Sequence, residues 1–259
     1  NIFYEGQMQQ HIYHFSYDHQ DDALSSLAYY YDVDIDVLKF KLPQLISYIQ
    51  SLKDKHLYEE ATESGMLQTN IALFINPNFQ EKEHSILRIS FYHRCSTDGT
   101  AVWFKEGLLN NVEGIQAYIS KVSAFIPEIN TLIDQDKIIR VSKIKSMDEE
   151  KVELDGINGF YRYSDAQHVE NSGFNFPEIF MNMGIYKKVR EQLASNLKPT
   201  IVKFFVDREM NEVNHILAKY WYSLWLGDED VTTIGANAGR GKTIPYHHIQ
   251  QIYYLESIC

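Results

Sequence analysis

The chain has 259 residues, which suits one large domain, or a main domain with a smaller extension. Apolar residues make up 44% and charged residues 23%, values near globular usage that argue against disorder and coiled coil. A net charge of −11 argues against a large nonspecific nucleic-acid footprint, because phosphate binding needs Lys and Arg. The two cysteines are too few for a disulfide framework, so we expect a reducing, cytoplasmic location. No apolar run is long enough to span a bilayer.

The first part of the chain predicts one short strand followed by helices. Ile12–Phe15 has strand character, and Asp21–Tyr31 predicts a helix with an acidic cap. Asp36 can cap a second, short helix, and Pro43 is expected to open a third over Gln44–Leu52. The spacing of apolar residues from Leu24 to Leu42 also suits a helix-turn-helix, but the first fifty residues hold seven acids and two bases. A protein partner is therefore a better expectation than DNA.

The rest of the chain predicts strands alternating with helices. Strands are expected at Thr69–Asn76, Ser85–Tyr92, Ile138–Val141, Gly156–Ser164, Thr200–Val206, Val231–Ile234 and Ile249–Leu255. Helices are expected at Asp98–Phe104, Val112–Phe125, Pro177–Asn196 and Glu209–Leu226. This order predicts an α+β chain, with a mainly helical N-terminal extension over 1–68 and an α+β domain over 69–259.

One segment is more informative than the rest. A strand is expected to end in Tyr92-His93-Arg94, with a polar turn through Ser96 and a short helix leading to Gly107-Leu108. This segment resembles the first strand and helix of ADP-ribosyltransferase-fold proteins of the toxin and defence type. The resemblance implies that His93 holds the adenosine ribose of NAD, and that Arg94 and Ser96 line the same site. The alternative is that His93 makes a structural hydrogen bond.

The far end of the chain extends the resemblance. Asp228–Gly235, a Gly-rich loop and Thr243–Leu255 look like the closing pair of strands in that family. Glu229 matches the position of the catalytic glutamate. There it would bind the nicotinamide ribose 2′-hydroxyl and stabilise the oxocarbenium-like centre as nicotinamide leaves. The alternative is that Glu229 is one of three acids in an exposed turn.

A middle motif completes the resemblance. Gly159–Asp165 looks like the second family motif, so that Tyr161 or Tyr163 would stack on nicotinamide and Ser164 would orient Glu229. Tyrosine is also simply a good strand residue, which is the alternative. The resemblance covers 86–255, with an insertion near 112–155. It implies a split, mostly antiparallel β-sheet core.

The Gly-rich loop before the last strand is basic. A phosphate-binding loop would need a glycine where Ala236 stands and a helix where Pro245 blocks one, so we reject that motif. The resemblance instead suggests that Arg240 and Lys242 bind the substrate by contacting a phosphate of the acceptor. The alternative is a solvated hairpin loop.

Other chemistries find less support in the sequence. No spacing predicts a metal site, because the adjacent His247 and His248 would point to opposite faces of a strand. His93 and Cys95 share a strand face, as a nucleophilic pair would, but no oxyanion-stabilising group accompanies them.

We therefore expect transfer of ADP-ribose from NAD to a macromolecular acceptor, either nucleic acid or protein. Such an enzyme would belong among the toxin, toxin–antitoxin and antiviral-defence glycosyltransferases. One alternative is a noncatalytic interaction module whose acidic N-terminal region docks a protein partner. The other is a metal-dependent nuclease built on Glu153 and Asp155.

Overall fold

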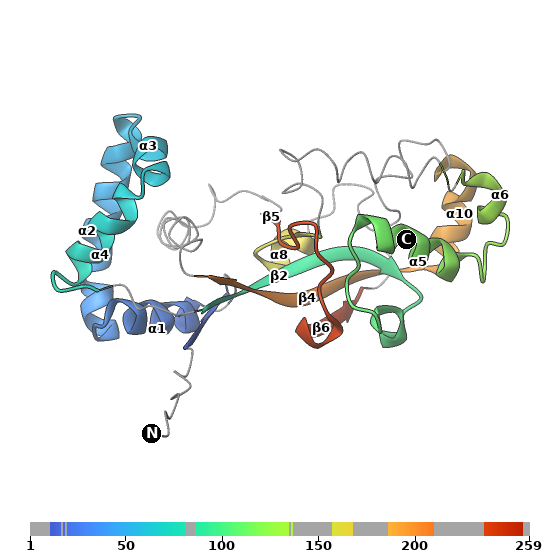
Figure 1. Cartoon of the computed structure of the whole chain (residues 1–259), viewed down its shortest axis with the longest axis horizontal. Coiled ribbons are helices and arrows are strands. Elements are labelled where there is room, and N and C mark those ends of the chain that lie inside the picture. The colour runs from blue at the N-terminus through green and yellow to red at the C-terminus, as the bar shows by residue number, and fades with distance from the viewer. Residues whose placement is uncertain are drawn as a thin grey trace, which may run out of the picture. The chain divides into compact units, whose positions relative to one another are not determined.

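The computed structural model shows an α+β chain, as predicted (Figure 1). It describes residues 11–16, 18, 20–80, 86–134, 136, 157–167, 186–209 and 236–255. The chain divides into two compact units, residues 1–90 with 207–232, and residues 91–206 with 233–259. The predicted elements at Ile138–Val141 and Val231–Ile234, and the helix after Glu209, lie outside the described residues.

The first unit is mainly helical. Its elements are β1 (Ile12–Phe15), α1 (Gln20–Tyr31), α2 (Ile35–Asp54), α3 (Tyr58–Glu63) and α4 (Met66–Ile75). Helix α2 contacts α1, α3 and α4, and α1 contacts β1. The side chains at the centre of this unit are fully buried, and include Leu27, Leu38, Ile49, Leu67 and Ile71.

Two predictions in this unit are wrong. Thr69–Asn76 is not a strand, because Leu67, Ile71 and Ile75 recur at helical spacing and are buried on one face of α4. Pro43 does not open a helix but lies inside the continuous helix α2. Pro43 and Lys39 are both exposed, so the hydrogen bond that proline removes falls on the solvent side.

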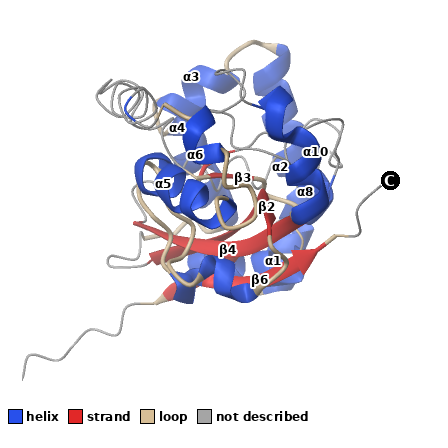
Figure 2. Ribbon diagram, turned by 90° about the vertical axis from the view of Figure 1, so that its right-hand side faces the viewer, coloured by secondary structure: helices blue, strands red, loops and turns tan. Residues whose placement is uncertain are grey.

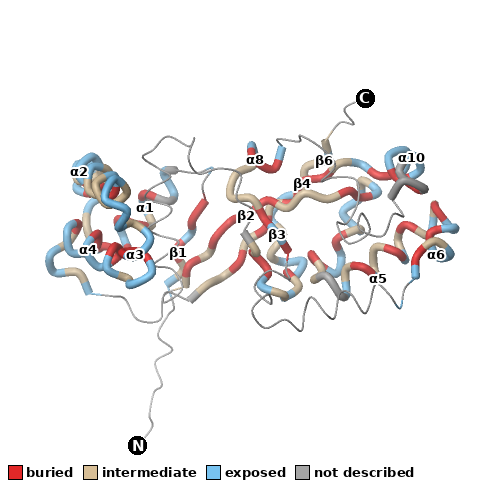
Figure 3. Tube along the Cα trace, turned by 90° about the horizontal axis from the view of Figure 1, so that it is seen from above, coloured by how far each residue is buried: buried red, intermediate tan, exposed pale blue. Residues whose placement is uncertain are grey.

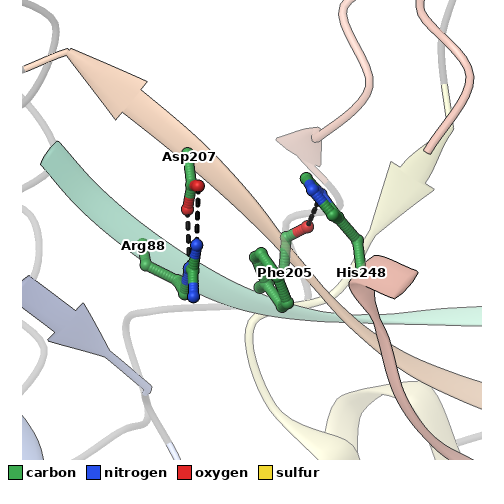
Figure 4. Close-up of polar contacts among 4 residues, drawn as sticks. All are labelled: Arg88, Phe205, Asp207 and His248. Carbon is green, nitrogen blue, oxygen red and sulfur yellow. Dashed lines mark hydrogen bonds and ion pairs between the residues drawn. The ribbon is translucent and has the colours of Figure 1, made fainter. Parts of the chain in front are cut away.

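Strand β2 (Ile86–Thr97) is longer than the sequence predicts. It does not break at His93 but continues to Thr97, whose hydroxyl pairs with that of Thr200 at 2.8 Å in a buried contact. Nearer its start, Arg88 donates two hydrogen bonds to Asp207, Nε to Oδ1 at 2.7 Å and Nη2 to Oδ2 at 2.8 Å (Figure 4). His93 therefore lies within a strand and not at its end.

The main sheet has four strands in the order β1-β2-β4-β6, where β4 is Lys198–Glu209 and β6 is Ile249–Tyr254 (Figure 2). Strand β1 pairs with β2 in parallel, and β4 pairs with β6 antiparallel. The prediction of a mostly antiparallel sheet is therefore corrected: the sheet is mixed. The long helical connection between β1 and β2 is what permits their parallel pairing.

Short elements complete the second unit. They are η1 (Ala101–Phe104), α5 (Asn111–Val122), α6 (Ile129–Leu132), β3 (Asn158–Gly159), α8 (Tyr163–Gln167), α10 (Tyr186–Asn196), β5 (Ala236–Asn237) and η4 (Tyr246–His248). Helices α5, α6 and α10 share one hydrophobic core. Within the described ranges, no helix is long and apolar enough to cross a membrane.

The strand predicted at Gly156–Ser164 is wrong beyond its first residues. Asn158 and Gly159 form β3, Phe160 makes an isolated antiparallel bridge with Tyr92, and α8 begins at Tyr163. The helix forms because Asp165 is buried in its first turn, where it accepts hydrogen bonds from Arg162 at 3.0 and 3.1 Å. His247 and His248 also differ from expectation, since they lie in the turn η4 and not in a strand.

Candidate functional site

His93 is held by a backbone group from a distant segment. Its Nδ1 atom lies 2.8 Å from the carbonyl oxygen of Asn158 on β3. A carbonyl only accepts, so Nδ1 carries the proton and Nε2 is left as an acceptor. Burial lowers the pKa of His93 from its ordinary value, which favours this neutral form at neutral pH. The ring can therefore accept a hydrogen bond from a hydroxyl group through Nε2.

Of the two candidate tyrosines, Tyr161 lies on the same face of the sheet as His93. Its ring packs on Phe91 with centroids 4.9 Å apart, and Phe91 and His93 are two residues apart on β2. Gly159 makes this approach possible. A Cβ atom there would lie 2.8 Å from the Cβ of Phe91, closer than side chains tolerate.

Three of the other expected NAD contacts lie on the opposite face. Tyr163 packs against Tyr92 and Tyr253, with centroids 5.8 and 4.7 Å away. The Arg94 guanidinium lies 4.7 Å from the centre of the Phe160 ring, which belongs to the same cluster. Strand alternation also places the buried Ser96 there. Tyr163, Arg94 and Ser96 therefore lie together on the face of β2 that is opposite to the His93 side chain.

The predicted basic loop is a tight turn joined to the His93 region. Strand β5 pairs with β3 so that Asn237 faces Asn158, the residue that holds His93. Beyond it, the Lys242 amide donates to the Gly239 carbonyl at 2.9 Å, with Arg240 and Gly241 both at positive φ. Consecutive positive φ angles define a type I′ turn. Arg240 and Lys242 are exposed at this turn.

A second contact joins Gly107-Leu108 to Ile244-Pro245, which lies in the segment Thr243–Leu255. Leu108 and Ile244 form an antiparallel bridge with N–H···O distances of 2.9 and 2.8 Å. Gly107 has φ +88°, and a Cβ atom there would lie 2.0 Å from the Ile244 carbonyl oxygen. Next to the bridge, the hydroxyl of Thr243 donates to Glu113 Oε2 at 2.7 Å. The two motifs, far apart in the sequence, are therefore in direct backbone contact.

The residue directly before the last strand, His248, packs on β4. The rings of His248 and Phe205 stack with centroids 4.3 Å apart, and His248 Nδ1 lies 3.2 Å from the Phe205 carbonyl oxygen (Figure 4). This contact fixes the turn η4 against β4 just before β6 begins.

No protein-family model matches the chain, and neither a curated protein nor a solved structure does so.

Sequence reasoning did not find two polar residues of this region. Asn158 positions His93, and Glu113 anchors Thr243 beside the basic turn. The Asn-Gly pair at 158–159 was the available signal for a tight backbone approach. Nothing in the sequence pointed to Glu113, which begins a helix expected to belong to an insertion.

Of the remaining expected residues, Ser164 is exposed on α8. Glu229, Glu153 and Asp155 lie outside the described residues. In the part of the chain that the structure describes, no three His, Cys, Asp or Glu side chains are grouped to hold a metal ion.

Proposed function

We propose that the chain transfers ADP-ribose from NAD to a macromolecular acceptor. The single observation that carries the proposal is the convergence of three distant segments in the second unit. The strand around His93, the segment 157–161 and the loop 237–245 are joined by backbone hydrogen bonds. These are the segments that the family resemblance marked out, in the same order along the chain.

The proposal gives His93 and Tyr161 separate roles. Neutral His93 offers Nε2 to a ribose hydroxyl, an uncharged donor that needs an acceptor of this kind. Tyr161 offers an aromatic surface on the same face of β2, suited to the planar nicotinamide ring. Glu229 supplies the negative charge that the oxocarbenium-like centre requires. The finer fold assignment, an ADP-ribosyltransferase-like core, is part of this proposal.

The two exposed basic side chains of the turn, Arg240 and Lys242, suit an acceptor that carries negative charge. Arg240 occupies a positive-φ position that disfavours long side chains, and its backbone amide donates to Asn237 Oδ1 at 2.7 Å. Arg240 and Lys242 are both exposed at this turn, and phosphate is the kind of anion that their side chains bind. We assign them to acceptor binding.

The test uses NAD labelled in its adenylate phosphate, incubated with the purified protein and a cell lysate. We expect label in protein or nucleic acid with the wild type, and a loss of about a hundredfold or more in Glu229→Gln and His93→Ala. Tyr163→Phe is the matched control, because Tyr163 lies on the opposite face from His93, and it should keep the activity. Absence of both labelling and nicotinamide release with the wild type would refute the proposal.

A further inference from the structure

The first unit exposes apolar side chains on two neighbouring helices. Of the ten large hydrophobic side chains that stand exposed in the described residues, five belong to α2 and α4. Phe40 is the extreme case, with 75% of its surface exposed. We call this surface the α2–α4 face, and it consists of Val37, Phe40, Met66, Leu73 and Phe74. Figure 3 shows exposed stretches along both helices.

The two helices pack side by side and antiparallel. The Lys41 ammonium donates to the carbonyls of Phe74 and Ile75, at 2.7 and 2.9 Å, and lies 5.3 Å from the centre of the Phe74 ring. Further along α2, the Tyr48 hydroxyl accepts a hydrogen bond from Asn70 at 2.8 Å. Increasing residue numbers on α2 therefore meet decreasing numbers on α4.

These contacts bring the exposed apolar residues to one surface. Val37 lies one helical turn before Lys41, and Phe40 follows Val37 by three residues. On α4, Met66 and Leu73 lie one turn on either side of Asn70. The apolar side chains thus flank the seam between α2 and α4 along its length.

Acidic groups border this face. Asp36 is exposed and lies one turn before Phe40, and Glu63 is exposed three residues before Met66. Lysines lie on α2 as well: the ammonium of Lys41 is engaged by the two carbonyls at the end of α4, and Lys39 is exposed next to Phe40 in the sequence. Acids still outnumber lysines in residues 11–80, by ten to four. An apolar stripe with an acidic border fits the apolar face of a helix whose flanks are basic.

We infer that the α2–α4 face binds a basic amphipathic helix of a partner protein. A second copy of the chain would bring equal acidic borders together in a molecule of charge −11. Anionic membranes and nucleic acids would meet the same repulsion. This binding needs neither NAD nor the second unit's site, so it stands independently of the proposed enzyme activity.

Three fluorescent peptides of about 18 residues test the inference, since that length spans five helical turns. The first carries leucines at helical spacing among lysines. The second replaces its lysines with glutamates. The third keeps the composition of the first but scatters the leucines. We expect fluorescence anisotropy to show the first peptide binding at least about tenfold more tightly than the other two, with affinity falling as salt rises.

Variants locate the binding. Phe40→Ser and Met66→Ser should each weaken binding of the first peptide by about tenfold, with unchanged melting temperatures because both side chains are exposed. Val102→Ser is the matched control, since Val102 is 69% exposed in η1 of the other unit. Equal binding of the three peptides, or wild-type affinity in both variants, would overturn the inference. So would dimerisation, or vesicle binding by the protein alone, that depends on Phe40.

Discussion

Substitution of Gly107 directly tests the backbone contact between Leu108 and Ile244. Alanine at this position would take a positive φ, which costs about 1–2 kcal/mol for a residue with a Cβ atom. Its Cβ would also lie 2.0 Å from the Ile244 carbonyl oxygen, a backbone atom that cannot turn aside. The chain must separate there and lose the two hydrogen bonds between Leu108 and Ile244, each contributing about 0.5–1.5 kcal/mol. The total for Gly107→Ala is about 2–5 kcal/mol.

Gly99 provides the control within the same unit. It also has positive φ, at +82°, but a Cβ there would meet only the flexible side chain of Lys198, at 2.9 Å. Gly99→Ala should therefore lower the free energy of unfolding by about 1–2 kcal/mol, the backbone penalty alone. Urea unfolding followed by circular dichroism and tryptophan fluorescence measures both variants. Equal losses in the two would refute the claim that the Leu108–Ile244 bridge carries the difference.

Three further predictions concern ionisable groups. Asp207 raises the pKa of Arg88 by hydrogen bonding, so an Arg88→Gln and Asp207→Asn double-mutant cycle should show a coupling of about 1 kcal/mol that shrinks in high salt. Burial lowers the pKa of His93 in the folded chain below its ordinary value of 6.5. As the pH falls, His93 therefore takes up a proton in the unfolded chain before it does so in the folded chain. The free energy of unfolding should accordingly fall as the pH drops through 6.5 toward the lower folded pKa. His93→Gln should flatten that slope, and an unchanged slope would count against a neutral His93. Burial raises the pKa of Cys95 to about 12, which leaves little of the reactive thiolate at pH 8. In a Cys259→Ser variant, iodoacetamide should therefore label Cys95 about a thousandfold more slowly in the folded chain than in urea at that pH.

The sequence predicted helices and strands best where the spacing of apolar residues fitted only one of the two. Ile12–Phe15 forms β1 as predicted, and Thr200–Val206 lies within β4, because alternating or wholly apolar short runs bounded by turns favour strands. The run at Thr69–Asn76 was apolar throughout, a pattern that a buried strand and a buried helix share. The residues before this run favour the helix, since Leu67 adds a further buried position at helical spacing.

The candidate site was predictable only in part. The Tyr-His motif predicted that His93 holds a ribose of NAD, and this stays a prediction. The structure shows the structural hydrogen bond that is the alternative interpretation of the motif, with the carbonyl of Asn158 as the partner. Motif order carries no information about sheet faces, so the sequence could not show that Arg94 and Tyr163 lie on the opposite face from His93. The sequence predicted that this strand would end at Tyr92, so His93 and Arg94 were not expected to alternate between the two faces of β2, which continues to Thr97.

The parallel pairing of β1 with β2 has a consequence for the order of folding. The chain from Ser16 to residue 85, which includes helices α1–α4, must be looped out before Ile12 meets Ile86. Closing a loop of this size costs on the order of 4 kcal/mol in chain entropy when it is flexible. Helices made of local contacts form faster than such distant pairings and shorten the loop as they form. In pulsed hydrogen exchange, the amides of α1–α4 should therefore gain protection before those of β1, which closes the unit last.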